Sequence, residues 1–255
     1  MSQGAAVGFV DRLMCVKSGE NIERSSKVRL ILEGVEGVVV ALSVLLTWPL
    51  SRRWLRNWGS SPAERRRVWP GDRFVMPVHR TYTRAISIAA PSEAVWPWLI
   101  QFGLGRGGFY SYELLERLAG IPVCNVESIV PDFQDLAVGD EIRLHPKAPG
   151  IPVAALEAGK HLCFGMLEGL NDAVERPDPA RSWSMYVEPG AGRNSSRLLL
   201  RGCLETTRKQ TLLKRLGILI EEPIDFIMEQ RMLRTIRRLV EGQRDHKENT
   251  AVASR

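Results

Sequence analysis

Hydrophobic and polar residues alternate through much of the chain after residue 80, in short runs separated by turn-forming residues. In the first run, about residues 81–90, Tyr82, Ile86 and Ile88 share one face of an extended strand. Further runs, bounded by Gly, Pro, Asn or Asp, predict strands near residues 141–144, 152–156, 162–167, 183–187 and 197–204. The pattern therefore predicts a sheet of several short strands.

Apolar residues recur at helical spacing in two places within this region. The stretch Pro91–Tyr112, PSEAVWPWLIQFGLGRGGFYSY, predicts a short helix beginning at its proline, a run of four glycines, and the start of a second short helix over about residues 111–119. Residues 221–241 predict a long closing helix, in which Ile224, Met228 and Met232 begin one apolar stripe. The predicted order is a strand, two helices, several strands and a final helix.

A strongly apolar segment, LILEGVEGVVVALSVLLTWPL, occupies residues 30–50. Its uninterrupted part, residues 37–50, would be about 21 Å long as a helix, whereas a bilayer core is about 30 Å thick. Counted from residue 30, the segment is long enough to span, although it then contains Glu33 and Glu36. We expect a single transmembrane helix; the alternative is a helix buried against the domain.

The rest of the chain lies outside the predicted domain and the apolar segment. We expect a mobile tail over residues 1–29, a basic linker over 51–79, one domain over 80–242 and a disordered tail over 243–255. The linker includes the triplet Arg65–Arg67, which either contacts lipid headgroups or is simply solvated.

Positive charge is concentrated ahead of the predicted domain. Residues 1–80 hold thirteen Lys/Arg and seven Asp/Glu, which accounts for the whole net charge of +6. A neutral domain behind a basic segment argues against nucleic-acid binding and favours an anionic membrane surface. We expect Arg52, Arg53 and Arg56 to contact that surface, with the protein crossing the membrane once and its domain in the cytoplasm.

Metal and cofactor motifs are missing from the sequence. The cysteines and histidines are scattered, without CxxC, HExxH or other zinc-ligand spacing, so we expect unpaired thiols, no metal and no cofactor; the residues are Cys15, Cys124, Cys163, Cys203, His79, His145, His161 and His246. The run Gly103–Gly108 fits GxGxxG but follows a helix rather than a strand, so we interpret it as a hinge and not as a dinucleotide site.

Several of these features together resemble the SRPBCC superfamily. The resemblance lies in VWPWLIQFGLGRGGFYSYELLERL after a strand, PGD upstream, VGDEIRL downstream and EEPIDFIMEQRMLRTIRR near the end, and it covers roughly residues 56–242. It implies an α+β START-like helix-grip fold, with a curved antiparallel sheet of about six to seven strands around the long C-terminal helix; the membrane-type helix precedes it. Because the superfamily has no universal catalytic motif, the resemblance implies no particular substrate.

Two main functions remain open. A helix-grip cavity could bind a hydrophobic small molecule or lipid without transforming it, and its expected lining is Trp96, Tyr110, Tyr112, Phe164, Met166, Trp183, Met185, Met228 and Met232. The alternative is that these side chains fill a solid core and leave no cavity. A cyclase or dehydrase acting on a polyketide-like substrate would instead need a buried acid or base, and the candidates are Glu113, Tyr110, Tyr112, His145 and Arg231. A third possibility is a structural or partner-binding role at the membrane.

Overall fold

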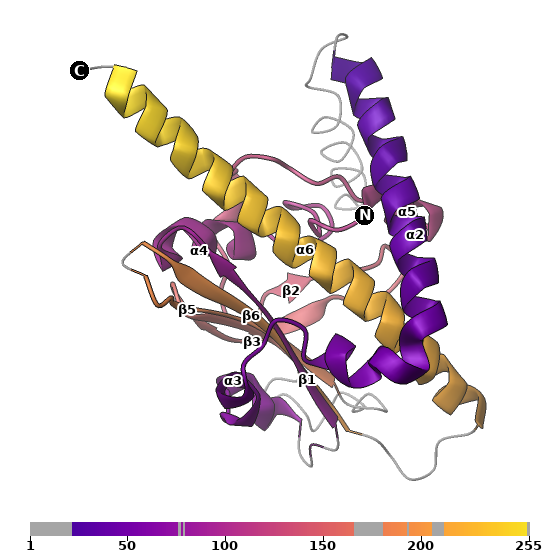
Figure 1. Cartoon of the computed structure of the whole chain (residues 1–255). Coiled ribbons are helices and arrows are strands. Elements are labelled where there is room, and N and C mark those ends of the chain that lie inside the picture. Colours follow the sequence, from indigo (N-terminus) through magenta and orange to yellow (C-terminus); the bar gives the residue numbers. More distant parts are fainter. Residues whose placement is uncertain are drawn as a thin grey trace, which may run out of the picture.

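The structure is a computed structural model that describes residues 22–75, 78, 80–165, 181–192, 194–205 and 212–253. Two long helices lie on the same side of a single sheet, one of them across its face and the other against the first, with shorter helices around them (Figure 1). The helices are α2 (Ile22–Arg56), α3 (Pro62–Arg66), α4 (Ser92–Ile100), α5 (Glu113–Leu118) and α6 (Leu212–Ala253), with 3-10 turns η1 (Pro70–Phe74) and η2 (Pro131–Phe133). The strands are β1 (Arg80–Ile88), β2 (Glu141–Ile142), β3 (Ile151–Glu157), β4 (His161–Phe164), β5 (Arg181–Pro189) and β6 (Ser196–Leu204).

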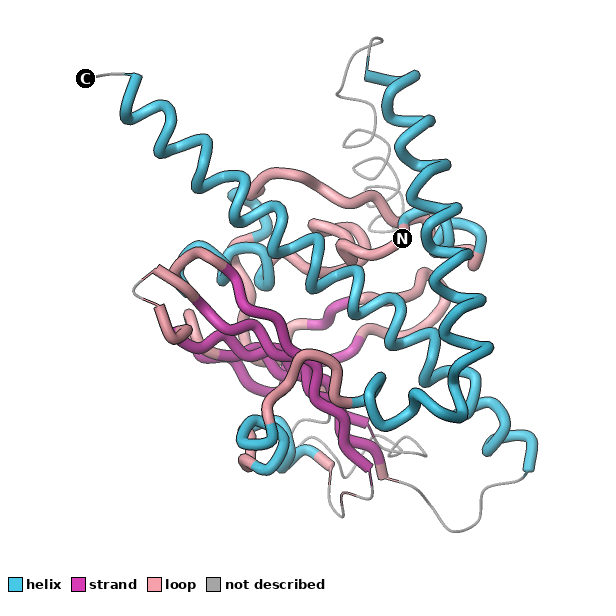
Figure 2. The backbone as a smooth tube through the Cα atoms, viewed as in Figure 1, coloured by secondary structure: helices cyan, strands magenta, loops and turns pink. Residues whose placement is uncertain are grey.

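The six strands form one antiparallel sheet in the order β1-β6-β5-β4-β3-β2. The first and last strands of the chain are neighbours, and their register places Arg80 opposite Leu204 and Ile88 opposite Ser196. The tube in Figure 2 follows the curvature of this sheet beneath the long helix. The predicted curved antiparallel sheet is therefore confirmed, with the two-residue strand β2 at its far edge.

The inner face of the sheet packs against α4 and α6 (Figure 1). Because strand side chains alternate between faces, each of the long strands contributes every second residue to this core. The main contributions from strands and closing helix are Ile86, Ile88, Leu162, Met185, Val187, Leu198, Leu200, Leu233 and Ile236. This packing of a long C-terminal helix across a sheet is the helix-grip arrangement that the resemblance implied.

The outer face of the sheet is covered by the segment that the sequence predicts as a basic linker. Its 3-10 turn η1 brings Trp69 against Tyr186, with ring centroids 4.4 Å apart. Asp72 in the same turn accepts a hydrogen bond from Arg201 Nε at 2.6 Å. Arg67 of the basic triplet pairs with Glu188 at 2.5 Å. This part of the segment is therefore built into the domain.

Helix α2 is longer than the predicted span and packs along the domain through one side. Gly34 and Gly37 lie against α5, where a Cβ built on Gly37 would be only 2.8 Å from Leu115 Cδ1. Farther along, Val44 and Leu55 are buried in a cluster with α6 residues. One described helix, through its segment Val28–Trp48, is long and apolar enough to cross a membrane. The docking of α2 thus combines features of both expectations, a membrane-type segment and a helix packed on the domain.

Helix α6 extends beyond the predicted closing helix at both ends. It begins at Leu212 rather than at residue 221, so that Pro223 lies inside it, and it continues past Gly242 to Ala253. A proline removes one backbone hydrogen bond, and here the helix continues on both sides of it. The closing segment and part of the predicted disordered tail are thus a single helix.

The glycine run between α4 and α5 is a tight loop, as the hinge interpretation requires. Gly103, Gly105 and Gly108 have positive φ angles, which favour glycine. The loop is fixed by the Asn125 side chain, whose Oδ1 accepts hydrogen bonds from the backbone N–H groups of Phe109 at 2.9 Å and Tyr110 at 2.7 Å. Three of the four glycines in the run thus stand where the loop backbone adopts a positive φ angle.

Candidate apolar binding hollow

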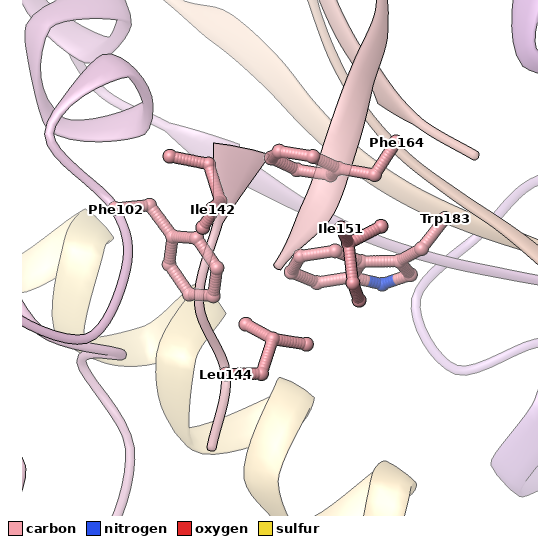
Figure 3. Close-up of a pocket in the computed structure, with 6 residues that line it drawn as sticks. All are labelled: Phe102, Ile142, Leu144, Ile151, Phe164 and Trp183. Carbon is pink, nitrogen blue, oxygen red and sulfur yellow. The ribbon is translucent and has the colours of Figure 1, made fainter. Parts of the chain in front are cut away.

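A small apolar hollow lies at the end of the inner face where β2 and β3 form the edge of the sheet. Figure 3 shows six side chains that point toward a common space. They come from the loop after α4, from β2 and the residues following it, and from β3, β4 and β5; they are Phe102, Ile142, Leu144, Ile151, Phe164 and Trp183. None of the six is ionisable.

Aromatic rings form one wall of this hollow. Phe164 and Trp183 on neighbouring strands are stacked, with centroids 5.5 Å apart and an angle of 19° between their planes. Phe102 lies 5.3 Å from Trp183, measured between ring centroids, and is tilted against it. Flat faces of this kind favour contact with planar or flexible hydrophobic groups.

The empty space in the hollow is small. Its enclosed volume is only about 10 Å³. That leaves room for about one water molecule or one methyl group. A larger ligand therefore requires the surrounding side chains to move.

The polar edge of Trp183 is held by a buried ion pair next to the hollow. The Trp183 indole N–H donates to Glu229 Oε1 at 2.9 Å, and the Tyr82 hydroxyl donates to the same oxygen at 2.6 Å. Arg84, which is fully buried, donates to Glu229 Oε2 at 2.5 Å and to the backbone oxygen of Leu55 at 3.1 Å. Burial, and then the charge of Glu229, raises the pKa of the Tyr82 phenol. This network joins α2, β1, β5 and α6.

The structure brings together only some of the residues that the sequence predicts as lining. Phe164 and Trp183 line the hollow. Met185 and Met232 are buried in the main core, and Trp96 packs against that core from a partly buried position. Tyr110 is buried in the same core.

The other predicted lining residues lie elsewhere. Tyr110 accepts a hydrogen bond from Gln101 Nε2 at 2.7 Å, and its φ of +57° places it in the left-handed region. Tyr112 and Met228 belong to the cluster between α2 and α6. Met166 lies outside the described residues.

Four lining residues were absent from the predicted set: Phe102, Ile142, Leu144 and Ile151. A signal for two of them was present, because Ile142 and Leu144 alternate within the predicted strand near residues 141–144. The predicted aromatic and methionine residues lie mostly toward the centre of the sheet, whereas this hollow is at its edge.

The candidate acids and bases do not reach the hollow. Glu113 accepts a hydrogen bond from the Asn125 backbone N–H at 3.2 Å and pairs with Arg117. His145 Nδ1 accepts from the Lys147 backbone N–H at 3.1 Å. Arg231 pairs with Glu33 and Glu36, at 3.2 Å in each case. Within the described part of the chain, no three His, Cys, Asp or Glu side chains are arranged to hold a metal ion.

Glu116 is a buried carboxyl group that is not among the acids and bases predicted from the sequence. Glu116 in α5 is buried; its Oε1 accepts a hydrogen bond from the Ser111 hydroxyl and its Oε2 has no hydrogen-bond partner. Burial, and then the nearby charge of Glu113, raises the pKa of Glu116 from 4.5 to about 8. Glu116 is not among the residues that line the hollow.

Comparisons with known proteins give only distant similarity. No family model and no curated protein matches the chain. Similar solved structures include a protein from Mesorhizobium loti, with 17% identity over 64% of this chain and 97% of that one and a TM-score of 0.33. A Nitrosomonas europaea protein has 15% identity over 65% and 96% of the two chains, with a TM-score of 0.36.

A Polyketide_cyc-like protein from Corynebacterium glutamicum has 15% identity over 67% of this chain and 97% of its own, with a TM-score of 0.34. Scores at this level carry no functional argument, so the assignment of the fold rests on the topology described above. Strand β1 beside β6, two short helices after β1 and a long C-terminal helix across the sheet give this chain an α+β helix-grip fold, the fold that the resemblance to the SRPBCC superfamily implies, with an apolar N-terminal helix.

Proposed function

We propose that this protein binds a hydrophobic small molecule in the apolar hollow, next to a membrane that α2 contacts. The observation that carries the proposal is the convergence of six uncharged, apolar side chains from separate segments on one open space. Small-molecule sites are concave and mostly apolar, with few polar groups. The neighbouring charges of Arg84 and Glu229 are paired with each other, so they do not demand a charged ligand.

The ligand enters by displacing the more exposed side of the lining. Leu144 and Ile151 are only partly buried and come from a loop and from a strand near the sheet edge, whereas Phe164 is buried. Movement of those two aliphatic side chains would expose the stacked faces of Phe164 and Trp183. A ligand with a flat or branched apolar end fits this wall best.

Binding without chemistry is favoured over a cyclase or dehydrase reaction. General acid–base catalysis needs an ionisable group within hydrogen-bond reach of the reacting atom, and the six lining residues supply none. Glu113, His145 and Arg231 are engaged with other partners. The hollow can therefore hold an apolar group but has no lining residue that transfers a proton.

The proposed membrane location rests on α2. Its Val28–Trp48 segment is long and apolar enough to span a bilayer, as the sequence predicts for a single-pass protein. Of the three arginines expected at the membrane surface, Arg52 and Arg56 pair with Glu222, while Arg53 is exposed. Arg53 is thus the arginine best placed to meet anionic headgroups.

Methyl NMR of the full chain tests the proposed hollow directly. The neutral dye N-phenyl-1-naphthylamine is titrated into protein with labelled Ile and Leu methyl groups. Shifts at Ile142, Leu144 and Ile151 are expected, and Leu144→Trp, which fills the hollow, should remove them. Leu118→Trp, at an exposed position in α5, is the matched control and should bind like wild type. Shifts confined to the exposed leucines of α2, or equal binding by Leu144→Trp, would show that the hollow is not the site.

A further inference from the structure

The half of α2 that faces away from the domain is a continuous apolar surface. Its leucines and valines recur three or four residues apart and are exposed, among them Leu32, Val35, Val39, Leu42, Leu46 and Leu50. Leu46 is 82% exposed and Leu50 is 94% exposed. We call this set the outer face of α2. A contiguous apolar patch of this length marks a membrane or protein contact.

The opposite side of α2 is tied to the domain from one end of the helix to the other. Arg29 pairs with Glu127 at 2.6 Å near the start, and Glu33 pairs with Arg231 at 3.2 Å one turn later. At the far end, Arg56 pairs with Glu222. In Figure 1, α2 accordingly runs alongside α5 and crosses the beginning of α6.

Hydroxyl groups at the border of the outer face need no water. Ser43, Thr47 and Ser51 each donate to the backbone oxygen four residues earlier, at 2.8, 2.8 and 2.9 Å. Polar groups satisfied inside the helix can be placed in lipid without an unpaired donor. These hydroxyl groups therefore place no obstacle to acyl chains beside the outer face.

Resting on the membrane contact of the proposed function, we infer that α2 stays docked and lies along the bilayer surface instead of crossing it. The outer face is immersed among acyl chains, with the helix axis parallel to the membrane. A spanning orientation of the docked helix would carry the ion pairs of Arg29, Glu33 and Arg231 into hydrocarbon, where charged groups are disfavoured. Arg53, exposed beside Leu50 and Trp54, contacts anionic headgroups at one end.

Flotation with vesicles tests the surface and its partner. Full-length protein should float with phosphatidylcholine vesicles, and more strongly when phosphatidylglycerol is included. Leu46→Glu should weaken binding by about 10- to 100-fold, since it removes one fully immersed leucine. Arg53→Glu should reduce only the added binding to phosphatidylglycerol. Val68→Glu, at an 83% exposed apolar position outside α2, is the control and should bind like wild type.

Spin-label depth measurements distinguish a helix lying on the surface from one that spans. Single cysteines replace Leu32, Val39, Leu46 and Thr47 in a Cys15→Ser, Cys124→Ser background; the buried thiols of Cys163 and Cys203 remain. A surface helix gives equal depths at Leu32, Val39 and Leu46 and a shallower label at Thr47. A spanning helix gives different depths at Leu32 and Val39 but nearly equal depths at the adjacent Leu46 and Thr47, and that result would overturn the inference.

A second copy of the chain is the competing occupant of the outer face. Failure of wild-type protein to float, together with a dimer in light scattering that Leu46→Glu dissociates, would replace the membrane by a protein interface. Neither a loss of flotation nor dimerisation through α2 changes the methyl NMR titration of the hollow. The membrane inference and the proposed ligand binding can therefore fail separately.

Discussion

At the scale of single residues, the buried pair of Arg84 and Glu229 connects four elements, α2, β1, β5 and α6. Arg84 also lies over the rings of Tyr82 and Phe226, with its guanidinium carbon 4.4 and 5.3 Å from their centroids. Arg84→Leu should destabilise the protein by about 3–5 kcal/mol, because it leaves a buried carboxylate without its cation. Urea unfolding followed by circular dichroism measures the loss.

A second substitution separates lost charge pairing from lost packing. Glu229→Gln in the Arg84→Leu background removes the unpaired charge but keeps an acceptor for Tyr82 and Trp183. The double variant should therefore be more stable than Arg84→Leu alone. If it is no more stable, the contribution of Arg84 lies in its contacts with the rings.

Glu116 provides a prediction about pH. Its folded-state pKa of about 8 lies above the ordinary value of 4.5, so the folded protein holds a proton that the unfolded chain loses between these values. Stability should therefore fall as pH rises from about 4.5 to about 8. Glu116→Gln carries no titrating proton and should exceed wild type by on the order of 1–3 kcal/mol at pH 8, with a smaller difference at pH 5. Urea midpoints of both proteins at the two pH values check this, and parallel pH profiles would contradict it.

The contrast between Glu113 and Glu116 shows where residue-scale prediction from the sequence stops. Both occur in the short helix that helical spacing identified, and the sequence favoured Glu113 as the functional carboxyl group. In the structure Glu113 has an arginine partner, whereas Glu116 is the one that is buried. Burial of one or the other depends on how α5 packs in the tertiary structure, and a helix of six residues does not encode that in its own periodicity.

At the scale of elements, the contact between α2 and α5 depends on the absence of side chains at two glycines. A side chain at Gly37 would meet Leu115 and Tyr112, the latter at 3.0 Å from the added Cβ. Gly37→Leu should overpack this contact at a cost of about 1–3 kcal/mol and loosen the N-terminal half of α2. Hydrogen exchange should then increase in residues 28–44 while the sheet stays protected.

The matched control for this substitution is Gly242→Leu in α6. Gly242 has open space around its Cβ position, and leucine favours helices by nearly 1 kcal/mol over glycine. Hydrogen exchange in α2 should be unchanged in this variant. Faster exchange in both variants would indicate that α2 opens for a reason other than its fit against α5.

Strands were the elements that the sequence predicted best. Residues 183–187 and 197–204 fall within β5 and β6, because two-residue alternation is decided locally by which face meets the core. The sequence predicts only a linker after α2, because the packing of that segment depends on partners more than 100 residues away. Trp69 packs against Tyr186, and Asp72 pairs with Arg201. No local sequence pattern predicts such contacts.

At the scale of the whole molecule, the two long helices belong to one packed unit with the sheet. The order of predicted elements and the resemblance together anticipated the helix-grip arrangement, whereas the spatial order of the strands, with β1 beside β6, comes from the structure. The hollow could not be located in the same way, because its open space depends on how six side chains from distant segments fill the sheet edge. Residue type predicts that the side chains around a cavity are apolar, but only the packing in the folded protein determines where they leave space unfilled.

Removal of residues 1–56 tests this unity. The truncation deletes Val44 and Leu55, whose cluster includes Phe226 and Ile227 of α6. It also takes Arg52 and Arg56 away from Glu222, which is buried and, within the described part of the chain, would keep only Arg80 as an ion-pair partner. The exposed apolar surface and the lost ion pairs both act against folding, so the truncated chain should be aggregated or markedly less stable than the full chain.

Solubility, proton NMR dispersion and thermal unfolding of residues 57–255 and of the full chain in detergent provide the comparison. Substitution of Phe226 and Ile227 by Ser in the truncated chain should improve its solubility without restoring stability, because the Glu222 ion pairs remain absent. A truncated chain that is soluble, well dispersed and as stable as the full protein would mean that α2 is an appendage. In that case its docking along α5 and α6 would contribute little, and an undocked helix crossing the bilayer would become the better description.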